Sequence, residues 1–395
     1  MNMKRILTAL ILTFAAVALS AQESSVLVNV VCGPFVQNVT TTGFTVVWVS
    51  DNDAIGWVEV APKDEQHFYY AERPKFYDMS GCGIKPVNKI HKVQVTGLEP
   101  GKTYRYRVMM KAVDHYYSQL DIVYGKEYGA NTYTAVLPEI TTQKESYKEV
   151  RFAMVNDLHE KDSILRSLFS DEKRNKGFDF VFFNGDMTST ISDEAKIMNH
   201  VLIPASETFA SYCPLYFTRG NHEFRGKDAI KILDYYAFPE GKPYYTFTYG
   251  DVFFLVMDSG EDKPDSDIEY QDAYCTEPYL LQEAEWMKGV VASDAWKKAK
   301  RRIVFSHIPP DTKNAWHGNY NMATIFLPIL NAAGVDLMLC GHYHHYYSRK
   351  KGEHDAAFPV VINSNCERME VSVTDSKISM EVYDADGKKV HTLSL

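Results

Sequence analysis

The sequence predicts an α/β domain, built of β-sheets flanked by helices, that is preceded by an all-β sandwich. Three observations support this fold class. The chain has 395 residues, which is long enough for two domains of ordinary size. Up to about residue 140, β-branched and aromatic runs are separated by turn residues, as is typical of strands. Beyond about residue 150, short apolar runs alternate with helical stretches, which indicates an α/β sheet.

The composition is that of a globular protein, because 45% of the residues are hydrophobic and 24% are charged. These fractions exclude a disordered, collagen-like or coiled-coil chain. The 51 acidic residues outnumber the 42 lysines and arginines, so the net charge is −9 at pH 7. Since this balance repels polyanions on average, we expect no nucleic-acid partner, unless a local basic patch provides one.

Residues 1–21 have the features of a cleavable signal peptide. Two positive charges precede an apolar run from Ile6 to Leu19 that is too short to span a bilayer. Small residues follow and offer a cleavage site after Ser20 or Ala21. We therefore expect an exported protein, secreted or periplasmic, without a membrane span. A retained N-terminal anchor is the alternative. Six cysteines permit disulfides in such a protein, but the sequence leaves their pairing open.

Residues 27–140 are expected to form the all-β domain. Residues 44–49 are a β-branched and aromatic run that predicts a strand. A turn at residues 100–101 precedes a second strand, which begins near Tyr104. This tyrosine just beyond a turn resembles the tyrosine corner of a fibronectin type III domain, which implies a hydrogen bond from the tyrosine to nearby backbone. The resemblance also implies that Trp48 is the buried tryptophan of the sandwich.

Strand and helix patterns alternate beyond a polar linker at residues 138–150. The predicted strands are the apolar runs Arg151–Val155, Asp179–Phe183, Pro214–Thr218, Val252–Met257, Arg302–Phe305 and Asp336–Cys340. The predicted helices are Asp162–Lys173, Ser192–Leu202, Lys227–Tyr236, Pro278–Val291 and Met322–Ala333. After Phe358 the pattern returns to strands and ends with a hairpin across residues 384–387. The acidic, tyrosine-rich segment 260–279 is expected to be either a lid or a solvated insertion.

Five groups of metal-type ligands each follow one of the predicted strands. The groups are Asn156-Asp157-Leu158-His159, Asn184-Gly185-Asp186, Arg219-Gly220-Asn221-His222-Glu223, Ser306-His307 and Gly341-His342-Tyr343-His344. Each group alone is also compatible with an ordinary turn or a loop hydrogen bond. Ligands in open α/β sheets collect beyond the carboxyl ends of the strands, so all five groups can converge at one edge. Their joint occurrence in this order predicts a metal site.

This order of motifs resembles the calcineurin-like metallophosphoesterase superfamily over about residues 150–395. The preceding sandwich resembles the N-terminal domain of purple acid phosphatases. The resemblance implies two divalent or trivalent metal ions, for which Mn, Fe and Zn all suit the mixed ligands. One ion would be held by Asp157, His159 and His344, and the other by Asn221, His307 and His342. Asp186 would bridge the two ions.

The resemblance implies an exported phosphoesterase acting on a small phosphate ester, most simply a phosphomonoesterase. A hydroxide that bridges the two metals would attack phosphorus, and His222, beside the metals without binding either, would be the general acid. A phosphodiesterase or a nucleotide or lipid headgroup hydrolase of the same fold is the alternative. A non-enzymatic surface-binding protein is the alternative from another class. The oligomeric state remains open.

Two further residues are candidates for substrate contacts. Arg225 follows the Gly-Asn-His-Glu-Phe run and would contact a phosphate oxygen, unless it is exposed or salt-bridged. His317 lies on a loop that follows His307 in the chain and would line the substrate site.

Two positions depart from the purple acid phosphatases. Those enzymes lack the histidine of the Asp-x-His motif, which is present here as His159. Those enzymes have a tyrosine three residues after the Gly-Asp aspartate, and this tyrosinate is the metal ligand that gives the purple colour. This chain has Ser189 there. We therefore predict that the iron-loaded protein lacks the strong visible charge-transfer band, and an absorption spectrum that shows the band would refute the ligand assignment. Many other family members have an aspartate at this position that supports the histidine acid, so Glu223 or Ser189 is expected to support His222 instead.

Overall fold

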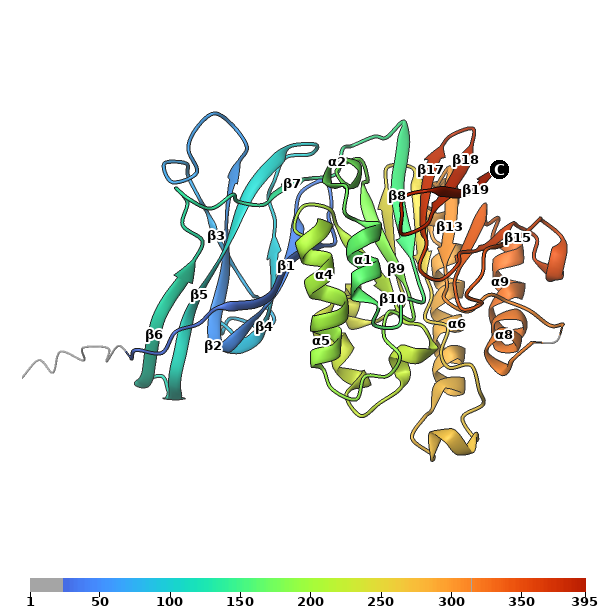
Figure 1. Ribbon diagram of the computed structural model, residues 1–395, viewed down its shortest axis with the longest axis horizontal. Coiled ribbons are helices and arrows are strands. Elements are labelled where there is room, and N and C mark those ends of the chain that lie inside the picture. The colour runs from blue at the N-terminus through green and yellow to red at the C-terminus, as the bar shows by residue number, and fades with distance from the viewer. Residues whose placement is uncertain (1–23, 314) are drawn as a thin grey trace, which may run out of the picture.

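The computed structural model describes residues 24–313 and 315–395. The expected signal peptide, residues 1–21, lies outside the described residues. An all-β part occupies the left of Figure 1, and a larger part with sheets and helices occupies the right. Within the described ranges, no helix combines the length and the hydrophobicity that a membrane span needs.

Seven strands form the all-β part. They are β1 (Val30–Gln37), β2 (Phe44–Pro62), β3 (Lys75–Tyr77), β4 (Asn88–Val95), β5 (Thr103–Ser118), β6 (Asp121–Gly129) and β7 (Glu139–Thr141). The first half of β2 pairs with β1 and β4, whereas its second half pairs with β5. The strands enclose one apolar core, to which β1, β2, β4 and β5 all contribute. Between Val30 and Thr141 the structure thus contains strands and no helix.

Two aromatic side chains lie as expected for a β-sandwich. Trp48 is fully buried, and its ring stacks on that of His91 with the centroids 4.9 Å apart. The backbone N–H of Glu99 donates a hydrogen bond of 2.9 Å to the hydroxyl oxygen of Tyr104, across the turn between them. The contact joins the tyrosine hydroxyl to nearby backbone as expected, but here the backbone N–H is the donor. The assignment of the sandwich to the fibronectin type III class stays a prediction.

The burial of His91 predicts a pH-dependent stability. Burial lowers the pKa of its imidazole from 6.5 to about 4. The unfolded chain binds the imidazole proton more tightly than the folded chain does. The contribution of the neutral, buried His91 ring to the free energy of unfolding is therefore complete above pH 6.5 and is lost as the pH falls toward 4. The loss amounts to at most about 3 kcal/mol. Urea unfolding should therefore show that the free energy of unfolding falls less steeply with acidification in His91→Gln than in the wild type. Parallel pH profiles would contradict this account.

Two six-stranded sheets form the α/β part. The first has the order β10-β9-β8-β17-β18-β19, and the second has the order β11-β12-β13-β14-β16-β15. The strands of the first are β8 (Glu149–Val155), β9 (Phe180–Asn184), β10 (Leu215–Thr218), β17 (Arg368–Thr374), β18 (Ile378–Tyr383) and β19 (Lys389–Ser394). Those of the second are β11 (Tyr245–Tyr249), β12 (Val252–Val256), β13 (Arg301–Phe305), β14 (Leu337–Cys340), β15 (Tyr347–Arg349) and β16 (Val360–Ile362). Strands β8, β9 and β10 run parallel, as do β12, β13, β14 and β16.

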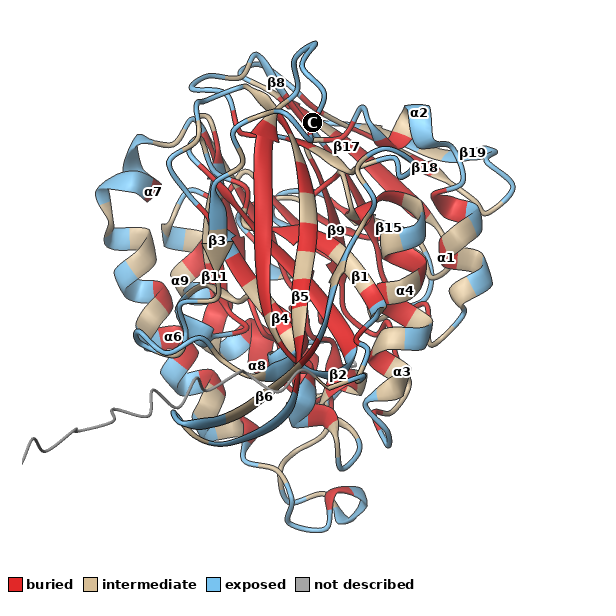
Figure 2. Ribbon diagram, turned by 90° about the vertical axis from the view of Figure 1, so that its left-hand side faces the viewer, coloured by how far each residue is buried: buried red, intermediate tan, exposed pale blue. Residues whose placement is uncertain are grey.

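The two sheets stack face to face, and helices cover their outer faces. Aromatic side chains such as Phe182 and Phe305 fill the space between the sheets, with these two rings stacked. The buried strands lie between two groups of helices in Figure 2. One group includes α1 (Asp162–Leu168), α2 (Glu172–Asn175), α3 (Ala195–Ile197), α4 (Ile203–Ala205) and α5 (Ile232–Tyr235). The other comprises α6 (Thr276–Ala292), α7 (Asp294–Lys298), α8 (His317–Asn321) and α9 (Leu327–Ala332).

The structure confirms the predicted strands of the α/β part, each within two residues of its expected bounds. Four of the five predicted helices differ. The helix expected over 322–333 begins at His317, because α8 continues through a π-helical turn into α9. The helix expected over 227–236 is a 3₁₀ turn followed by the short α5. The helix expected over 162–173 is interrupted, because the Asp171 side chain accepts a hydrogen bond from the Arg174 N–H and starts a separate helix. The helix expected to end at Leu202 continues to Ala210, since wide π-helical turns on both sides accommodate Pro204. All six cysteines are free.

The sandwich packs directly on the α/β part. Phe35 and Val47 of the sandwich belong to the same buried cluster as Phe217 and Tyr236 of the α/β part. The Tyr106 hydroxyl also donates a hydrogen bond of 2.7 Å to the carbonyl oxygen of Ser211. The two parts therefore share one continuous core along the helical side of the first sheet.

Candidate metal centre

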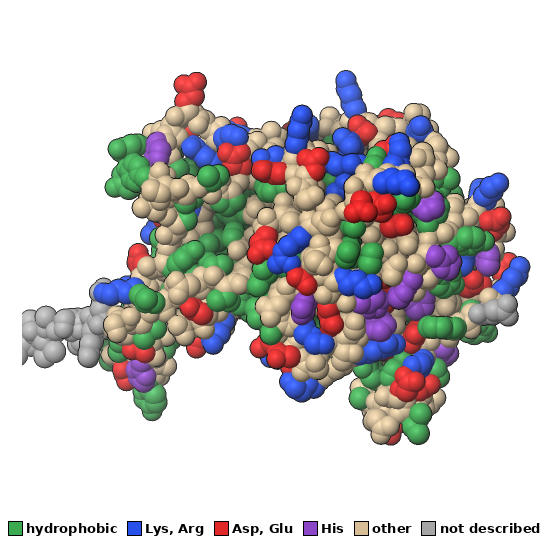
Figure 3. Space-filling model, in the orientation of Figure 1, with side chains coloured by type: hydrophobic (Ala, Val, Ile, Leu, Met, Phe, Trp, Pro, Cys, Tyr) green, Lys and Arg blue, Asp and Glu red, His purple; other side chains and the backbone are tan. Residues whose placement is uncertain are grey.

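The five sequence motifs meet at one edge of the stacked sheets. Asp157, Asp186 and Asn221 follow β8, β9 and β10 of the first sheet, and His307 and His342 follow β13 and β14 of the second. The carboxyl ends of parallel strands point to the same edge, so both sheets contribute ligands there. Figure 3 shows histidine side chains gathered on this face of the α/β part.

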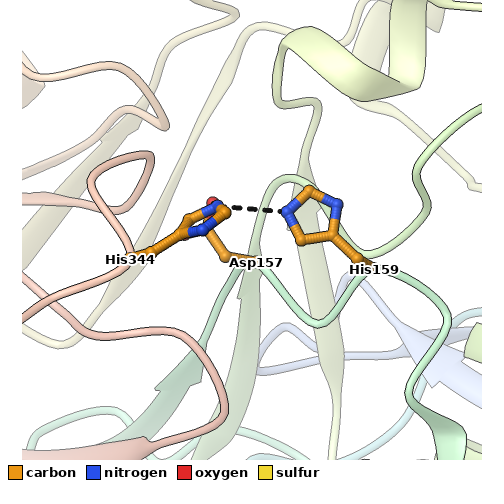
Figure 4. Close-up of side chains that lie close together, drawn as sticks. All are labelled: Asp157, His159 and His344. Atoms are coloured by element: carbon orange, nitrogen blue, oxygen red, sulfur yellow. Dashed lines mark hydrogen bonds and ion pairs between the residues drawn. The ribbon is translucent and has the colours of Figure 1, made fainter.

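Asp157, His159 and His344 form the first group of ligand atoms. One nitrogen or oxygen atom from each residue lies within 4.8 Å of the others. The Nε2 atoms of the two histidines are 3.1 Å apart, and His344 Nε2 lies 3.2 Å from Asp157 Oδ1. In Figure 4 the two imidazole rings point toward each other, with the Asp157 side chain beside that of His344. The three side chains can thus share one cation.

Asp186, His307 and His342 form a second group, again with ligand atoms within 4.8 Å of one another. His307 Nε2 lies 3.1 Å from Asp186 Oδ2 and 3.8 Å from Asp157 Oδ1. Asn221 Oδ1 lies 3.1 Å from His342 Nδ1 and so belongs to the same group. His307 contacts the carboxylates of both groups, which places the two groups side by side.

His222 lies beside both groups. Its ligand nitrogen falls within 4.8 Å of those of His159 and Asp186. Its Nδ1 is 2.8 Å from the carbonyl oxygen of Ser189, which fixes the orientation of the ring. This carbonyl is the support that the structure gives to the His222 ring, whereas the Glu223 carboxylate binds backbone groups.

The buried carboxylates of Asp157 and Asp186 give the site a preference for positive charge. Burial alone would raise the pKa of each, but the charge on His307 lowers both below the ordinary value. Burial likewise opposes the charged imidazole of His307, but the two carboxylates raise its pKa to about 10. Burial and the charge of His307 lower the pKa of His342 to about 4.

Among the fully buried polar atoms at this edge, two atoms of the proposed ligands make no hydrogen bond of normal geometry to the described residues. They are Asp157 Oδ1 and His307 Nε2. Such an atom costs about 1–3 kcal/mol unless a partner satisfies it, and a bound cation is such a partner. His307 Nδ1 donates to the carbonyl oxygen of Asn184 at 2.8 Å, which directs Nε2 into the site. The residues present therefore fit a pair of metal ions.

The backbone at the ligands is strained. Five residues of the two groups have positive φ angles, between 46° and 75°: Asp157, His159, Asp186, His342 and His344. Non-glycine residues rarely adopt this left-handed conformation, and it clusters at functional sites where the surrounding structure enforces it. The strain is therefore independent evidence that this edge is a functional site.

The glycines of the motifs allow the loops to approach the carboxylates closely. A Cβ atom on Gly341 would lie 2.7 Å from Asp157 Oδ2, and one on Gly220 would overlap Asp186 Oδ1. A side chain at either position would push a carboxylate out of place. These glycines are therefore required by the packing of the site.

Two buried polar residues of the ligand motifs support the site in a way that the sequence analysis did not predict. The Glu223 carboxylate accepts hydrogen bonds of 2.7 Å from the N–H groups of both Asp186 and Gly220, and so ties two ligand loops together. The Asn184 side chain donates to the carbonyl oxygens of Ser306 and Leu339 at 3.2 and 3.3 Å, and so joins the two sheets. Asn184 is the first residue of its ligand motif and ends β9, and this position is the signal that could have identified its role.

Arg225 lies next to His222, with its Nη1 3.2 Å from His222 Nε2. Its Nε and Nη2 donate to the buried carboxylate of Glu261 at 2.8 and 3.0 Å, and Nη2 also donates to Asp262 at 3.0 Å. The start of the 260–279 segment is therefore packed against the site, and it is neither detached nor fully solvated.

His317 lies elsewhere. Its Nε2 is 2.9 Å from Glu277 Oε1, and it is not among the residues that line the cavity over the metal ligands. The neighbouring Trp316 lines that cavity instead. A role of His317 in substrate binding stays a prediction.

The chain matches one family profile and resembles solved structures. The profile of the family described as calcineurin-like phosphoesterase matches residues 150–346. Among solved structures, the chain resembles the purple acid phosphatase PPD1 of yellow lupin (Lupinus luteus), with a TM-score of 0.65 and 15% identity, over 91% of this chain and 73% of that one. It also overlaps GAP50 of Plasmodium, described as the anchor in the inner membrane complex, with a TM-score of 0.45 and 17% identity, over 63% of this chain and 89% of that one.

No curated protein matches the sequence. The family profile nevertheless covers all five ligand motifs, and the resemblance to purple acid phosphatase extends over most of the chain. Residues 150–346 therefore form a calcineurin-like phosphoesterase domain, and the chain has the fold of a metal-dependent phosphoesterase.

Proposed function

We propose that the protein is a metal-dependent phosphomonoesterase. The supporting observation is that two groups of ligand atoms lie side by side around the buried carboxylates of Asp157 and Asp186. Asp157, His159 and His344 would hold one ion, Asn221, His307 and His342 the other, and Asp186 both. When bound, two ions of the Mn, Fe or Zn type would acidify water and neutralise the phosphoryl oxygens.

His222 is the proposed general acid. Its Nδ1–H donates to the carbonyl oxygen of Ser189, so the proton available for transfer is the one on Nε2. Nε2 lies 3.9 Å from Asp186 Oδ2, which places it at the rim of the ligand groups. The side chain is 26% exposed, so it can reach both a substrate and solvent. A protonated His222 would therefore give its proton to the leaving oxygen of the ester.

Arg225 is salt-bridged and does not line the cavity over the metal ligands, but its position next to His222 makes it the proposed contact to the phosphoryl group. Two of its nitrogens are held by Glu261 and Asp262, so the guanidinium is fixed before a substrate arrives. Its third nitrogen, Nη1, has no carboxylate partner among the described residues and points at His222. An ester oxygen that takes the His222 proton would lie within reach of this nitrogen. Arg225 would thus orient the ester.

A comparison of two synthetic esters tests the proposed function. The Mn²⁺-loaded protein should hydrolyse 4-nitrophenyl phosphate with a higher kcat/KM than bis(4-nitrophenyl) phosphate, and a chelator should abolish both reactions until Mn²⁺ is restored. A preference for the diester would support the phosphodiesterase alternative. Two bound metal ions without hydrolysis of either ester would support the surface-binding alternative and end the proposal.

Export is part of the same proposal and rests on the pattern of residues 1–21. Cleavage after Ser20 or Ala21 would give a mature chain that begins at Ala21 or Gln22. Intact-mass measurement of the protein from its native host tests this. A mass that includes the first twenty residues would support the retained anchor instead.

A further inference from the structure

The cavity over the metal ligands has a wall that the proposed reaction does not use. The cavity has a volume of about 600 Å³, which is within the range of small-molecule sites. One side is formed by Asp186, Asn221, His222, His342 and His344. The remaining side chains include the aromatic residues Trp316, Tyr343 and Tyr347. The others are Asp262, Asp311, Asn319, His345, Arg349 and His354. A substrate whose phosphate lies at the metals would extend its leaving group along this wall.

Trp316 is the largest side chain of the wall. It immediately precedes α8 and is 63% exposed. Its ring centroid lies 5.7 Å from that of the ligand residue His342, with the two planes perpendicular. The indole is therefore an open aromatic surface directly beside the metal ligands. Tyr347, which is 42% exposed, adds a second open ring to the same wall.

The charged groups along this wall are already paired. Arg349 is the one lysine or arginine among the described lining residues and is only 2% exposed. It donates to Asp311 Oδ2 at 2.8 Å and to the carbonyl oxygen of Pro310 at 2.6 Å. Asp311 also contacts His354, and Asp262 accepts from Arg225. Away from the metal ligands, the described lining thus offers no free lysine or arginine to a second phosphate group.

We propose that this wall is a leaving-group subsite for a flat aromatic ring that carries a single phosphate ester. The proposal rests on the phosphomonoesterase function and names its substrate class, which is aryl phosphates or nucleoside monophosphates. Trp316 stacks against the ring, because any aromatic ring offers a face for stacking on an indole. Polyphosphate esters are disfavoured because their additional charges would find no free cation along the wall.

Kinetics with matched substrates test the subsite. In Trp316→Ala, kcat/KM for 1-naphthyl phosphate and for adenosine monophosphate should each fall about tenfold, mainly through KM, because stacking on the indole is lost. Glycerol 2-phosphate, which has no ring, should be hydrolysed as by the wild type, which also shows that the variant folds. Trp316→Phe should retain most of the activity on aromatic esters.

Tyr320→Ala is the matched control. Tyr320 lies on α8, which Trp316 directly precedes, and its side chain is 52% exposed but does not line the cavity. This variant should leave all three substrates unaffected. An equal loss for ring-containing and ring-free esters in Trp316→Ala, or no loss at all, would overturn the proposal. If kcat/KM falls for only one of the two aromatic esters, the proposal is supported, and the affected ester identifies the kind of ring that the wall binds.

Calorimetric titration with 1-naphthol and adenosine separates the subsite from the reaction. Both ring compounds lack a phosphate and should bind the metal-loaded wild type more tightly than Trp316→Ala. If the wild type binds a ring through Trp316 but hydrolyses no phosphate ester, the proposed function is wrong and the subsite is supported. If the wild type hydrolyses every ester equally well and binds neither ring compound, the subsite is refuted and the proposed function is supported.

Discussion

Replacing Asp186 with asparagine is expected to abolish the hydrolysis of phosphate esters and to reduce metal binding. The Asp186 carboxylate is buried, lies 3.1 Å from His307 Nε2 and is the proposed ligand common to both ions. Asparagine has nearly the same shape but removes one negative charge. We expect kcat/KM to fall at least about 10³-fold, at the upper end of what one active-site electrostatic group contributes. Elemental analysis should find fewer than two ions per chain.

The fold should survive this change, because an asparagine oxygen can still accept the hydrogen bond of 2.9 Å from the His222 N–H. Asp193→Asn is the matched control. Asp193 is exposed, follows the same strand as Asp186 and caps the nearby N–H of Ala195. It should keep wild-type metal content and activity. An Asp186→Asn protein with two bound ions and full activity would refute the assignment of the bridging ligand.

His222→Ala should slow the hydrolysis of esters with poor leaving groups without removing the metals. General acid catalysis contributes about 10²–10⁴-fold, so kcat for glycerol 2-phosphate should fall by that factor. The loss for 4-nitrophenyl phosphate should be much smaller, because nitrophenolate leaves without a proton. Steady-state kinetics on the two esters, with metal analysis of the same samples, measure both effects.

The outcome for His222 also decides between two roles. The structure places its ring within ligand distance of Asp186 and His159, so a loss of metal in His222→Ala would make it a ligand. Unchanged metal content with equal rates on glycerol 2-phosphate would remove it from the reaction altogether. His115→Ala is the control, since this histidine lies on the sandwich, half exposed and paired with Asp121. It should change neither quantity.

The strands and the ligand motifs of the α/β part could be predicted because both are local signals. A short apolar run predicts a buried strand, and a ligand motif directly after it predicts a position at the sheet edge. The bounds of helices depend on less visible interactions. The chain stays helical through Pro204 because of the turns around it, and the cap at Asp171 interrupts a pattern that is otherwise continuously helical.

The supporting residues could not be predicted in the same way, because their partners are distant in the sequence. Asn184 donates to the carbonyl oxygen of Leu339, 155 positions away, and the contact exists only once the two sheets are stacked. Trp316 and His317 are neighbours, yet one lines the cavity and the other contacts Glu277. The way α8 packs in the fold decides which side chain faces the cavity. The periodicity of the sequence does not predict this packing.

The shared core between the sandwich and the α/β part makes each dependent on the other. Phe35 and Val47 cover apolar side chains of the phosphoesterase domain that would otherwise face water. A gene fragment that encodes residues 150–395 alone would leave this surface bare, so its product is expected to precipitate. Exchanging the sandwich between related proteins would need compensating substitutions on both sides of its interface with the α/β part. We therefore expect the sandwich and the phosphoesterase domain to fold as one unit.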